Sequence, residues 1–243
     1  MNQPFGSVEA TFKAFSEVVS PGKVEFFRRL GVDLVMGERT GAGFQDAYTG
    51  RWYFNCHSNG GVFNLGHRNS AVAEALRAAL SELDVGNHHL VSGWRSELAD
   101  RLLSTVDESL TKVVFTASGS EAVDSVIKAA RGATGRIVVV SIEGAWHGNT
   151  GFAYSASDQA YRTAFGADIG GFAQVPFDDQ AALEAAVTKD TALVIIEPIP
   201  ATLAMPVASD GYFAAVAEVC REQGAVLVFD EVQTGLGRTG HLW

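Results

Sequence analysis

The chain has 243 residues, of which 47% are apolar and 10% aromatic, enough to bury a substantial core. A formal net charge of -10 and a pI near 5.0 offer no basic surface to a nucleic acid and would repel an anionic membrane. Cys56 and Cys220 are too few and too far apart for a disulfide framework or a metal knuckle. We therefore expect a cytoplasmic protein with reduced thiols that acts on small molecules, without nucleic-acid or membrane partners.

The first hundred residues predict a hairpin and two helices. Strand-forming residues from Gly43 to Cys56 surround a turn at residues 48–51. A helix is expected to begin at Asn69 or Ser70, because apolar residues then recur every four positions and charged residues lie between them. Residues 92–106 repeat this pattern.

From residue 112 onward the chain predicts an open α/β sheet. Short apolar runs typical of strands buried on both faces occur at Val113–Phe115, Ile137–Val140, Leu193–Ile196 and Val226–Phe229. Helical stretches long enough to cross between parallel strands occupy Glu121–Arg131, Gln180–Val187 and Ser209–Gln223. In such sheets ligands bind at the carboxyl ends of the strands. The segments that follow the apolar runs are therefore the candidate site: residues 117–121, 141–149, 197–198 and 230–233.

The first of these segments has the pattern of an anion site at a helix start. Backbone N–H groups there are unpaired and lie at the positive end of the helix dipole, and Gly119 would let a phosphate come close. Ser118 and Glu121 also have the spacing of a capping box, a purely structural role that is compatible with phosphate binding.

The other segments bring an aromatic ring and carboxylates. Trp146 follows the second run in a glycine-bordered loop, where it serves either as a core residue or as a platform for a flat ring. Glu197 is equally well a loop acid or a site residue. Asp230 and Glu231 leave a buried strand directly, so a nearby cation is needed to keep them ionised. A protonated pyridine nitrogen or a magnesium ion would serve, and the magnesium reading is weaker because no partner acids have ligand spacing.

Four runs then resemble, in order, the motifs of the class III pyridoxal-phosphate aminotransferases. They are FTASGSEAVDSVIKAAR, EGAWHGNT, IIEPI and LVFDEVQTGLGRTG, and the upstream runs FQDAYTGRWYFNC and NLGHRNSAVAEAL resemble the N-terminal region of that family. The resemblance implies pyridoxal 5'-phosphate as cofactor. It also implies a fold type I-like large domain with a mostly parallel sheet, here residues 66–243 and incomplete at its C-terminus. Residues 1–65 would be a piece of the small domain.

The resemblance also implies a role for each matching residue. Gly119 and Ser120 would hold the cofactor phosphate, Trp146 would stack on the pyridine ring with His147 in support, and Asp230 would pair with the ring nitrogen. Val232 would pack on the opposite ring face and Gln233 would bind the phenolic oxygen. The substrate side would be formed by Glu197, Asn149 and Trp52. No metal is implied.

Two departures from the family pattern limit what the resemblance implies. In the family the lysine that carries the cofactor lies beyond the Asp-Glu-Val-Gln motif, so no catalytic residue is assigned in this chain. A fragment, half of a split enzyme and a noncatalytic relative remain open. Members that act on ornithine-type substrates grip an α-carboxylate with an arginine where this chain has Asn149. We therefore expect an amine or ω-amino acid donor and a keto acid acceptor.

We expect an aminotransferase that works as a homodimer or with a complementary chain. Three other functions remain open. They are an aminomutase, a racemase of the same superfamily, and a noncatalytic binding protein. A dinucleotide fingerprint at Gly235, Gly237 and Gly240 is rejected, because its glycines begin five residues after the strand and no helix follows them.

Overall fold

The computed structural model describes residues 3–84, 89–166 and 169–243. The chain divides into two compact units, Met1–Val91 and Ser92–Trp243. The boundary at residues 65 and 66 that the resemblance implies concerns the domains of a complete enzyme, and it stays a prediction. No helix in the described ranges combines the length and apolar character that crossing a bilayer requires.

The first unit contains the predicted hairpin within a three-stranded antiparallel sheet. The strands are β1 (Met36–Thr40), β2 (Gly43–Asp46) and β3 (Trp52–Phe54), in the order β1-β2-β3. The hairpin turn is fixed by Asp46, whose Oδ1 accepts hydrogen bonds from the Tyr48 and Thr49 N–H groups and from the Thr49 hydroxyl. The helices are α1 (Val8–Val18), α2 (Pro21–Arg29) and α3 (Ser70–Leu80). The side chain of Asn69 caps α3 as predicted, by accepting from the Val72 N–H.

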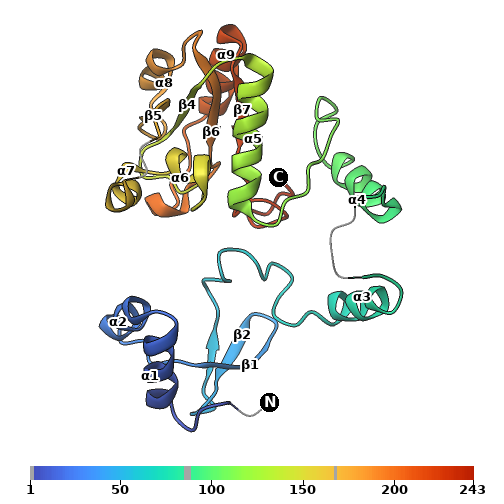
Figure 1. Cartoon of the computed structure of the whole chain (residues 1–243), viewed down its shortest axis with the longest axis vertical. Helices are drawn as coiled ribbons and strands as arrows, with labels where there is room; N and C mark the ends of the chain where they lie inside the picture. Colours follow the sequence, from blue (N-terminus) through green and yellow to red (C-terminus); the bar gives the residue numbers. More distant parts are fainter. Residues whose placement is uncertain (1–2, 85–88, 167–168) are drawn as a thin grey trace. The chain divides into compact units, whose positions relative to one another are not determined.

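The second unit is built on a four-stranded parallel sheet in the order β5-β4-β6-β7 (Figure 1). Its strands are β4 (Val138–Ile142), β5 (Phe172–Val175), β6 (Thr191–Ile196) and β7 (Val226–Phe229). Its α-helices are α4 (Gly93–Leu103), α5 (Gly119–Thr134), α6 (Gly151–Ala156), α7 (Gln159–Arg162), α8 (Gln180–Ala186) and α9 (Tyr212–Gln223). Two short 3-10 helices, η1 (Thr163–Phe165) and η2 (Ala201–Leu203), lie in the connections. The α/β class predicted from the sequence is confirmed.

Alternate residues of the central strands point to opposite layers of helices. One layer is α5 with α6, which covers Val139, Leu193 and Ile195. The other is α8 with α9, which covers Val140, Val194 and Ile196 among others. A strand between two helical layers is apolar on both faces, which is why Thr191–Ile196 is buried throughout. The period of two along each strand thus assigns every apolar residue to one of two cores.

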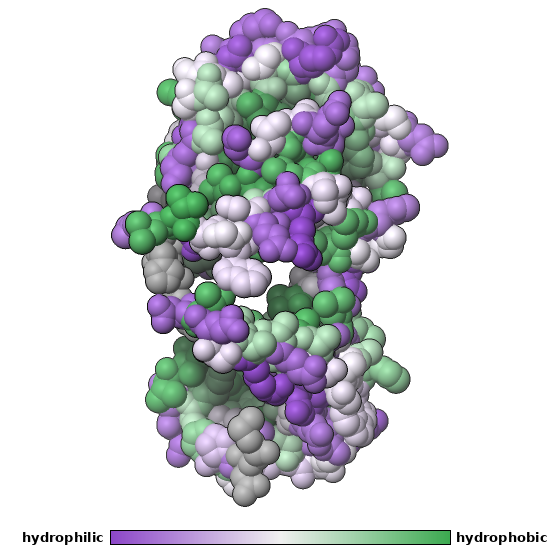
Figure 2. Space-filling model, turned by 90° about the vertical axis from the view of Figure 1, so that its right-hand side faces the viewer, coloured by the Kyte–Doolittle hydropathy of each residue, from purple (hydrophilic) through white to green (hydrophobic). Residues whose placement is uncertain are grey.

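The prediction of a strand at Val113–Phe115 is wrong. These residues form no strand, and Val114 and Phe115 are 76% and 43% exposed. An apolar run becomes a strand only when a neighbouring strand supplies its hydrogen bonds, and no described strand pairs with this run. Its side chains join the apolar residues that lie among polar ones on the surface of the protein; Figure 2 shows such mixing on one face.

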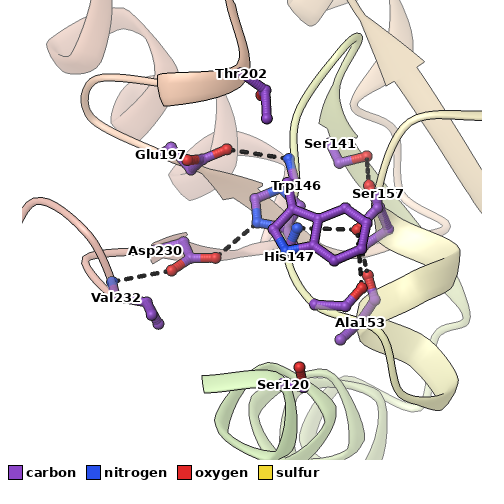
Figure 3. Close-up of polar contacts among 12 residues, drawn as sticks. Ser120, Ser141, Trp146, His147, Ala153, Ser157, Glu197, Thr202, Asp230 and Val232 are labelled. Carbon is purple, nitrogen blue, oxygen red and sulfur yellow. Dashed lines mark hydrogen bonds and ion pairs between the residues drawn. The ribbon is translucent and has the colours of Figure 1, made fainter. Parts of the chain in front are cut away.

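The sheet brings the predicted segments to one edge. Because β4, β6 and β7 are parallel, their carboxyl ends lie together, and the start of α5 lies beside them (Figures 1 and 3). The residues after Ile142, Ile196 and Phe229 are therefore neighbours in space although they lie far apart in the sequence. This edge contains the candidate site.

Candidate cofactor site

Asp230 is the most constrained side chain of the site. It follows β7 directly, is 8% exposed, and its Oδ2 lies 2.7 Å from Nδ1 of His147, which is also buried (Figure 3). Its Oδ1 accepts a hydrogen bond of 3.1 Å from the Val232 N–H. An ionised carboxylate only accepts, so the pair forms a hydrogen bond when Nδ1 of His147 carries the proton. These two contacts fix the orientation of the Asp230 carboxylate at the end of a buried strand.

The loop that carries Trp146 and His147 is held in place by the side chain of Ser157. The His147 N–H donates to the Ser157 hydroxyl oxygen at 2.9 Å, and that hydroxyl lies within hydrogen-bond distance of the Gly148 and Ala153 carbonyls (Figure 3). Ser157 is fully buried. It fixes the backbone on which the histidine is mounted, and therefore fixes the partner of Asp230.

Trp146 projects from this loop and remains 40% exposed, which excludes a core position in this unit. Its ring packs nearly at right angles to Tyr161 and Tyr154, with centroids 5.0 Å and 6.3 Å away. Edge-to-face packing of this kind holds an aromatic ring in one orientation. The indole is thus a rigid, partly accessible surface next to the Asp230–His147 pair (Figure 3).

Glu197 is a site residue by position rather than a loop acid. It follows β6, is 7% exposed, and its Oε1 accepts from the Trp146 N–H at 3.2 Å. Burial raises the pKa of Glu197 above its usual range, and the charge of Asp230 adds to this effect. His147 and the hydrogen bond from Trp146 oppose the rise in pKa. The side chain of Glu197 therefore fastens the tryptophan loop to the end of β6.

The start of α5 has the Ser118 cap that the sequence predicts, but Glu121 bonds to the residue before the cap rather than to the cap itself, as a capping box would require. The Ser118 hydroxyl accepts from the Glu121 N–H at 3.2 Å, and a Glu121 oxygen accepts from the Ala117 N–H at 2.9 Å. The N–H groups of Gly119 and Ser120 meet no acceptor among the described residues. They are free to bind an anion at the positive end of a 16-residue helix.

Gly119 gives room to Val232 where the segment after β7 crosses the helix start. A Cβ at Gly119 would lie 2.9 Å from a methyl carbon of Val232, so Val232 would have to shift to admit a side chain there. Val232 itself is 66% exposed, and Gln233 beside it is half-buried. The segment after β7 thus lies against the first turn of α5, which brings the residues predicted for the ring and for the phosphate together.

Of the other predicted substrate residues, Asn149 contacts this group. Asn149 is exposed and its side chain is bound to Ser120, with Oδ1 accepting from the Ser120 hydroxyl at 3.1 Å. Trp52 lies in β3 of the other unit and is 49% exposed. Its predicted place beside the substrate stays a prediction.

The residues present fit a phosphorylated pyridine cofactor. A buried carboxylate faces the site from β7, an accessible indole lies near it, and glycine keeps the helix start open. Within the described ranges no group of three or more histidines, cysteines or acids could hold a metal ion. Glu231 accepts from the Thr234 hydroxyl at 2.8 Å and so closes a turn after β7.

Sequence reasoning missed two features of the site. Ser157 lies in a polar stretch with no motif, and Tyr161 begins to matter only when α7 folds back towards Trp146. The segment after β7 forms turns rather than a helix, as the rejection of the dinucleotide fingerprint at Gly235 requires. The one available signal for Ser157 was its place fifteen residues beyond Ile142, the buried end of β4, which is too weak to single it out.

Known proteins resemble this chain over nearly all of its length. It is 48% identical over 231 residues to an uncharacterized aminotransferase of Archaeoglobus fulgidus, covering 95% of this chain and 54% of that protein. It is 35% identical over 237 residues to an acetylornithine aminotransferase of Methanosarcina mazei, covering 97% and 59%. The chain therefore spans little more than half the length of these relatives.

Solved structures agree on the fold. An ornithine aminotransferase from Toxoplasma gondii ME49 superposes with a TM-score of 0.87 at 24% identity, over 98% of this chain and 57% of that one. A taurine:2-oxoglutarate aminotransferase from Bifidobacterium kashiwanohense, solved with PLP and glutamate, gives 0.77 at 25% identity, over 86% and 52%. A family model described as aminotransferase class-III matches residues 30–243. The chain belongs to the class III aminotransferase family.

Proposed function

We propose that this chain is the cofactor-binding part of a pyridoxal 5'-phosphate-dependent aminotransferase, which moves an amino group from an amine or ω-amino acid to a keto acid. The observation that carries the proposal is the Asp230–His147 pair, placed beside Trp146 and the open start of α5. When bound, the pyridinium ring of the cofactor accepts the electron pair left behind as a proton leaves the substrate. Asp230 stabilises the charge of the ring nitrogen, and Trp146 holds the ring in position.

The phosphate is held in this proposal by the N–H groups of Gly119 and Ser120. Val232 contacts the face of the ring opposite Trp146, and Gln233 binds the phenolic oxygen. Glu197 borders the donor, where its raised pKa favours the neutral acid more than is usual for a glutamate. Because Asn149 is an amide rather than an arginine, it offers no bidentate clamp for an α-carboxylate. An amine or ω-amino acid donor is therefore favoured over an ornithine-type α-carboxylate.

The proposal places the enzyme in the cytoplasm. This is supported by its acidic charge and by two free cysteines, of which Cys220 is buried with a pKa raised by burial to about 11. The working assembly is proposed to be a homodimer, or a complex with a chain that carries the lysine of the family. Size-exclusion chromatography with light scattering distinguishes the homodimer from a monomer that awaits such a partner.

Cofactor binding by the chain itself is the first experiment. Pyridoxal 5'-phosphate added to the purified chain is expected to quench tryptophan fluorescence, and Trp146→Phe is expected to remove most of the quenching. Asp230→Ala is expected to weaken binding about tenfold or more, because the ring nitrogen loses a buried charge partner. Glu231→Gln is the matched control, since that carboxylate is occupied by Thr234. Equal affinities for wild type and Asp230→Ala would exclude Asp230 as the partner of the ring nitrogen.

Product analysis of the complete enzyme then separates the remaining functions. An aminotransferase consumes a keto acid and releases a new amine, whereas a racemase or an aminomutase needs no second substrate. A noncatalytic protein would bind the cofactor and show no absorbance change on addition of amines. A panel of donors tests the role of the amide at Asn149, and a clear preference for α-carboxylate donors would contradict the donor class proposed above.

A further inference from the structure

The side chain of Asn149 is joined to the helix start rather than to open space. Its Oδ1 accepts from the Ser120 hydroxyl at 3.1 Å, and its backbone N–H donates to the same hydroxyl oxygen at 3.2 Å. The two residues are 29 positions apart in the sequence. One hydroxyl group therefore links the first turn of α5 with the loop that carries Trp146 and His147.

Gly148 allows this link to form. Its φ is +136°, and a Cβ there would lie 2.5 Å from the Ser120 hydroxyl oxygen and 2.9 Å from the Ser120 Cα. Any other residue would push the loop away from the helix. One turn further along α5, Asp124 accepts from the Ala153 N–H at 2.7 Å. The loop and helix α6, which follows it, are thus each fastened to α5, and Asn149 forms the contact nearest the helix start.

The link decides which groups of Ser120 remain for an anion. A serine hydroxyl has one proton, and here that proton is directed to the Oδ1 of Asn149. The backbone N–H groups of Gly119 and Ser120 meet no acceptor among the described residues. A phosphate at the helix start is therefore received by backbone N–H groups, while the hydroxyl holds the loop in place.

We propose that Asn149 is a positioning residue for the cofactor phosphate, acting through the Ser120 hydroxyl. The inference rests on the phosphate site proposed above at Gly119 and Ser120. A neutral amide suits this role, because it accepts the hydroxyl proton without placing a negative charge beside the phosphate. Asn149 is then committed to the cofactor side of the site, and the substrate is recognised by other residues.

The experiment compares pyridoxal 5'-phosphate with pyridoxal, which has the same ring and no phosphate. Affinities are measured by fluorescence quenching for the wild type, Asn149→Ala, Asn149→Asp, Ser120→Ala and the double alanine variant. Asn149→Ala is expected to weaken pyridoxal 5'-phosphate about three- to tenfold, the effect of one lost hydrogen bond, and to leave pyridoxal unchanged. Asn149→Asp, which keeps the shape of the side chain, is expected to weaken it more than tenfold through repulsion of the phosphate.

The double variant tests whether Asn149 acts through Ser120. Its affinity for pyridoxal 5'-phosphate is expected to equal that of Ser120→Ala, because both changes remove the same link. The ³¹P chemical shift of the bound phosphate is a second readout, which Asn149→Ala should move towards the value in solution. Gln180→Ala, an exposed amide on α8, is the control and is expected to change neither affinity nor shift.

The outcomes separate a failure of the phosphate site from a failure of the role assigned to Asn149. If the wild type binds both ligands equally, the phosphate site at Gly119 and Ser120 is wrong and this inference falls with it. If the wild type prefers pyridoxal 5'-phosphate and Asn149→Ala keeps that preference, the site stands and Asn149 has no part in it. Equal weakening of both ligands by Asn149→Ala, or additive effects in the double variant, would assign the residue a general structural role instead.

Discussion

Two buried acids at neighbouring strand ends have different environments. Asp230 has the ring of His147 on one oxygen and the Val232 N–H on the other. Glu197 accepts from the Trp146 N–H, and burial raises its pKa. A buried acid whose pKa burial raises, at a strand end beside a second buried acid, is typical of functional sites.

The raised pKa of Glu197 predicts a pH-dependent gain in stability for Glu197→Gln. The folded chain holds this proton to a higher pH than the unfolded chain, whose glutamates titrate at about 4.3. Stability therefore falls as pH rises from that value through the folded pKa, and a glutamine escapes the loss. We expect the variant to have the higher urea midpoint at pH 7 and to lose its advantage as pH falls towards 4. Glu143→Gln, on the exposed side of the loop after β4, should follow the wild type.

Replacing Ser157 by alanine is expected to lower the stability of the protein. Ser157→Ala removes the acceptor of the buried His147 N–H, which we expect to cost about 1–3 kcal/mol in the free energy of unfolding. Cofactor affinity should fall as well, because the histidine that orients Asp230 moves with its backbone. Ser155→Ala is the comparison, since the Ser155 hydroxyl only donates to the Gly151 carbonyl. If both variants unfold at the same urea concentration, the Ser157 hydroxyl does not support the loop.

At the scale of elements, α5 combines support and binding in its first turn. Ser118 caps the helix, and the Ser120 hydroxyl holds the loop after β4. The backbone N–H groups of Gly119 and Ser120 remain available to an anion. We expect Ser118→Ala to cost about 1 kcal/mol in unfolding free energy, because the Glu121 N–H loses its partner. Ser125→Ala in the middle of α5 should change stability little. Calorimetry of both variants checks the difference. Equal transition temperatures would show that the Ser118 cap does not stabilise the protein.

The elements that could be predicted from the sequence are those whose signal is local. β6 and β7 are continuous apolar runs, and Asn69 and Ser118 are caps, so each is recognised without knowledge of its neighbours. β5 was missed because it is a four-residue edge strand that contains a polar Gln174. The run at Val113–Phe115 was wrongly assigned because strand formation depends on a partner elsewhere.

In the site, too, the residues with a local signal could be predicted and the contacts between distant segments could not. Asp230, Trp146 and Gly119 were recognised as ends of elements that carry chemical groups. The pairing of Asn149 with Ser120, and of Ser157 with His147, depends on how a loop folds back over 10 to 29 positions. No periodicity records such a contact, and only the folded backbone reveals it.

At the scale of the whole chain, no lysine of the described residues follows the carboxyl end of a strand at the Asp230 edge, and Lys112 lies in the stretch before α5 that forms no helix or strand. Lys13 and Lys23 belong to the first unit, Lys128 is exposed on α5, and Lys189 donates to the Glu222 carbonyl just before β6 begins, at the opposite end of the sheet. Borohydride reduction of the chain with pyridoxal 5'-phosphate is therefore expected to give slow labelling at several lysines. Peptide mass analysis checks this. One stoichiometric adduct on Lys128 or Lys189 would move the site elsewhere.

β7 has consequences for exchange with deuterated water. Among the described strands it pairs only with β6, and the Asp230 N–H bonds to the Ile196 carbonyl. By alternation the Val228 amide also faces β6, whereas the amides of Leu227 and Phe229 face away. We expect the Val228 amide to exchange slowly and the other two quickly. In a longer form of the protein, slow exchange at Leu227 and Phe229 would reveal a further strand beside β7, which makes these two amides a direct gauge of whether the sheet has been extended.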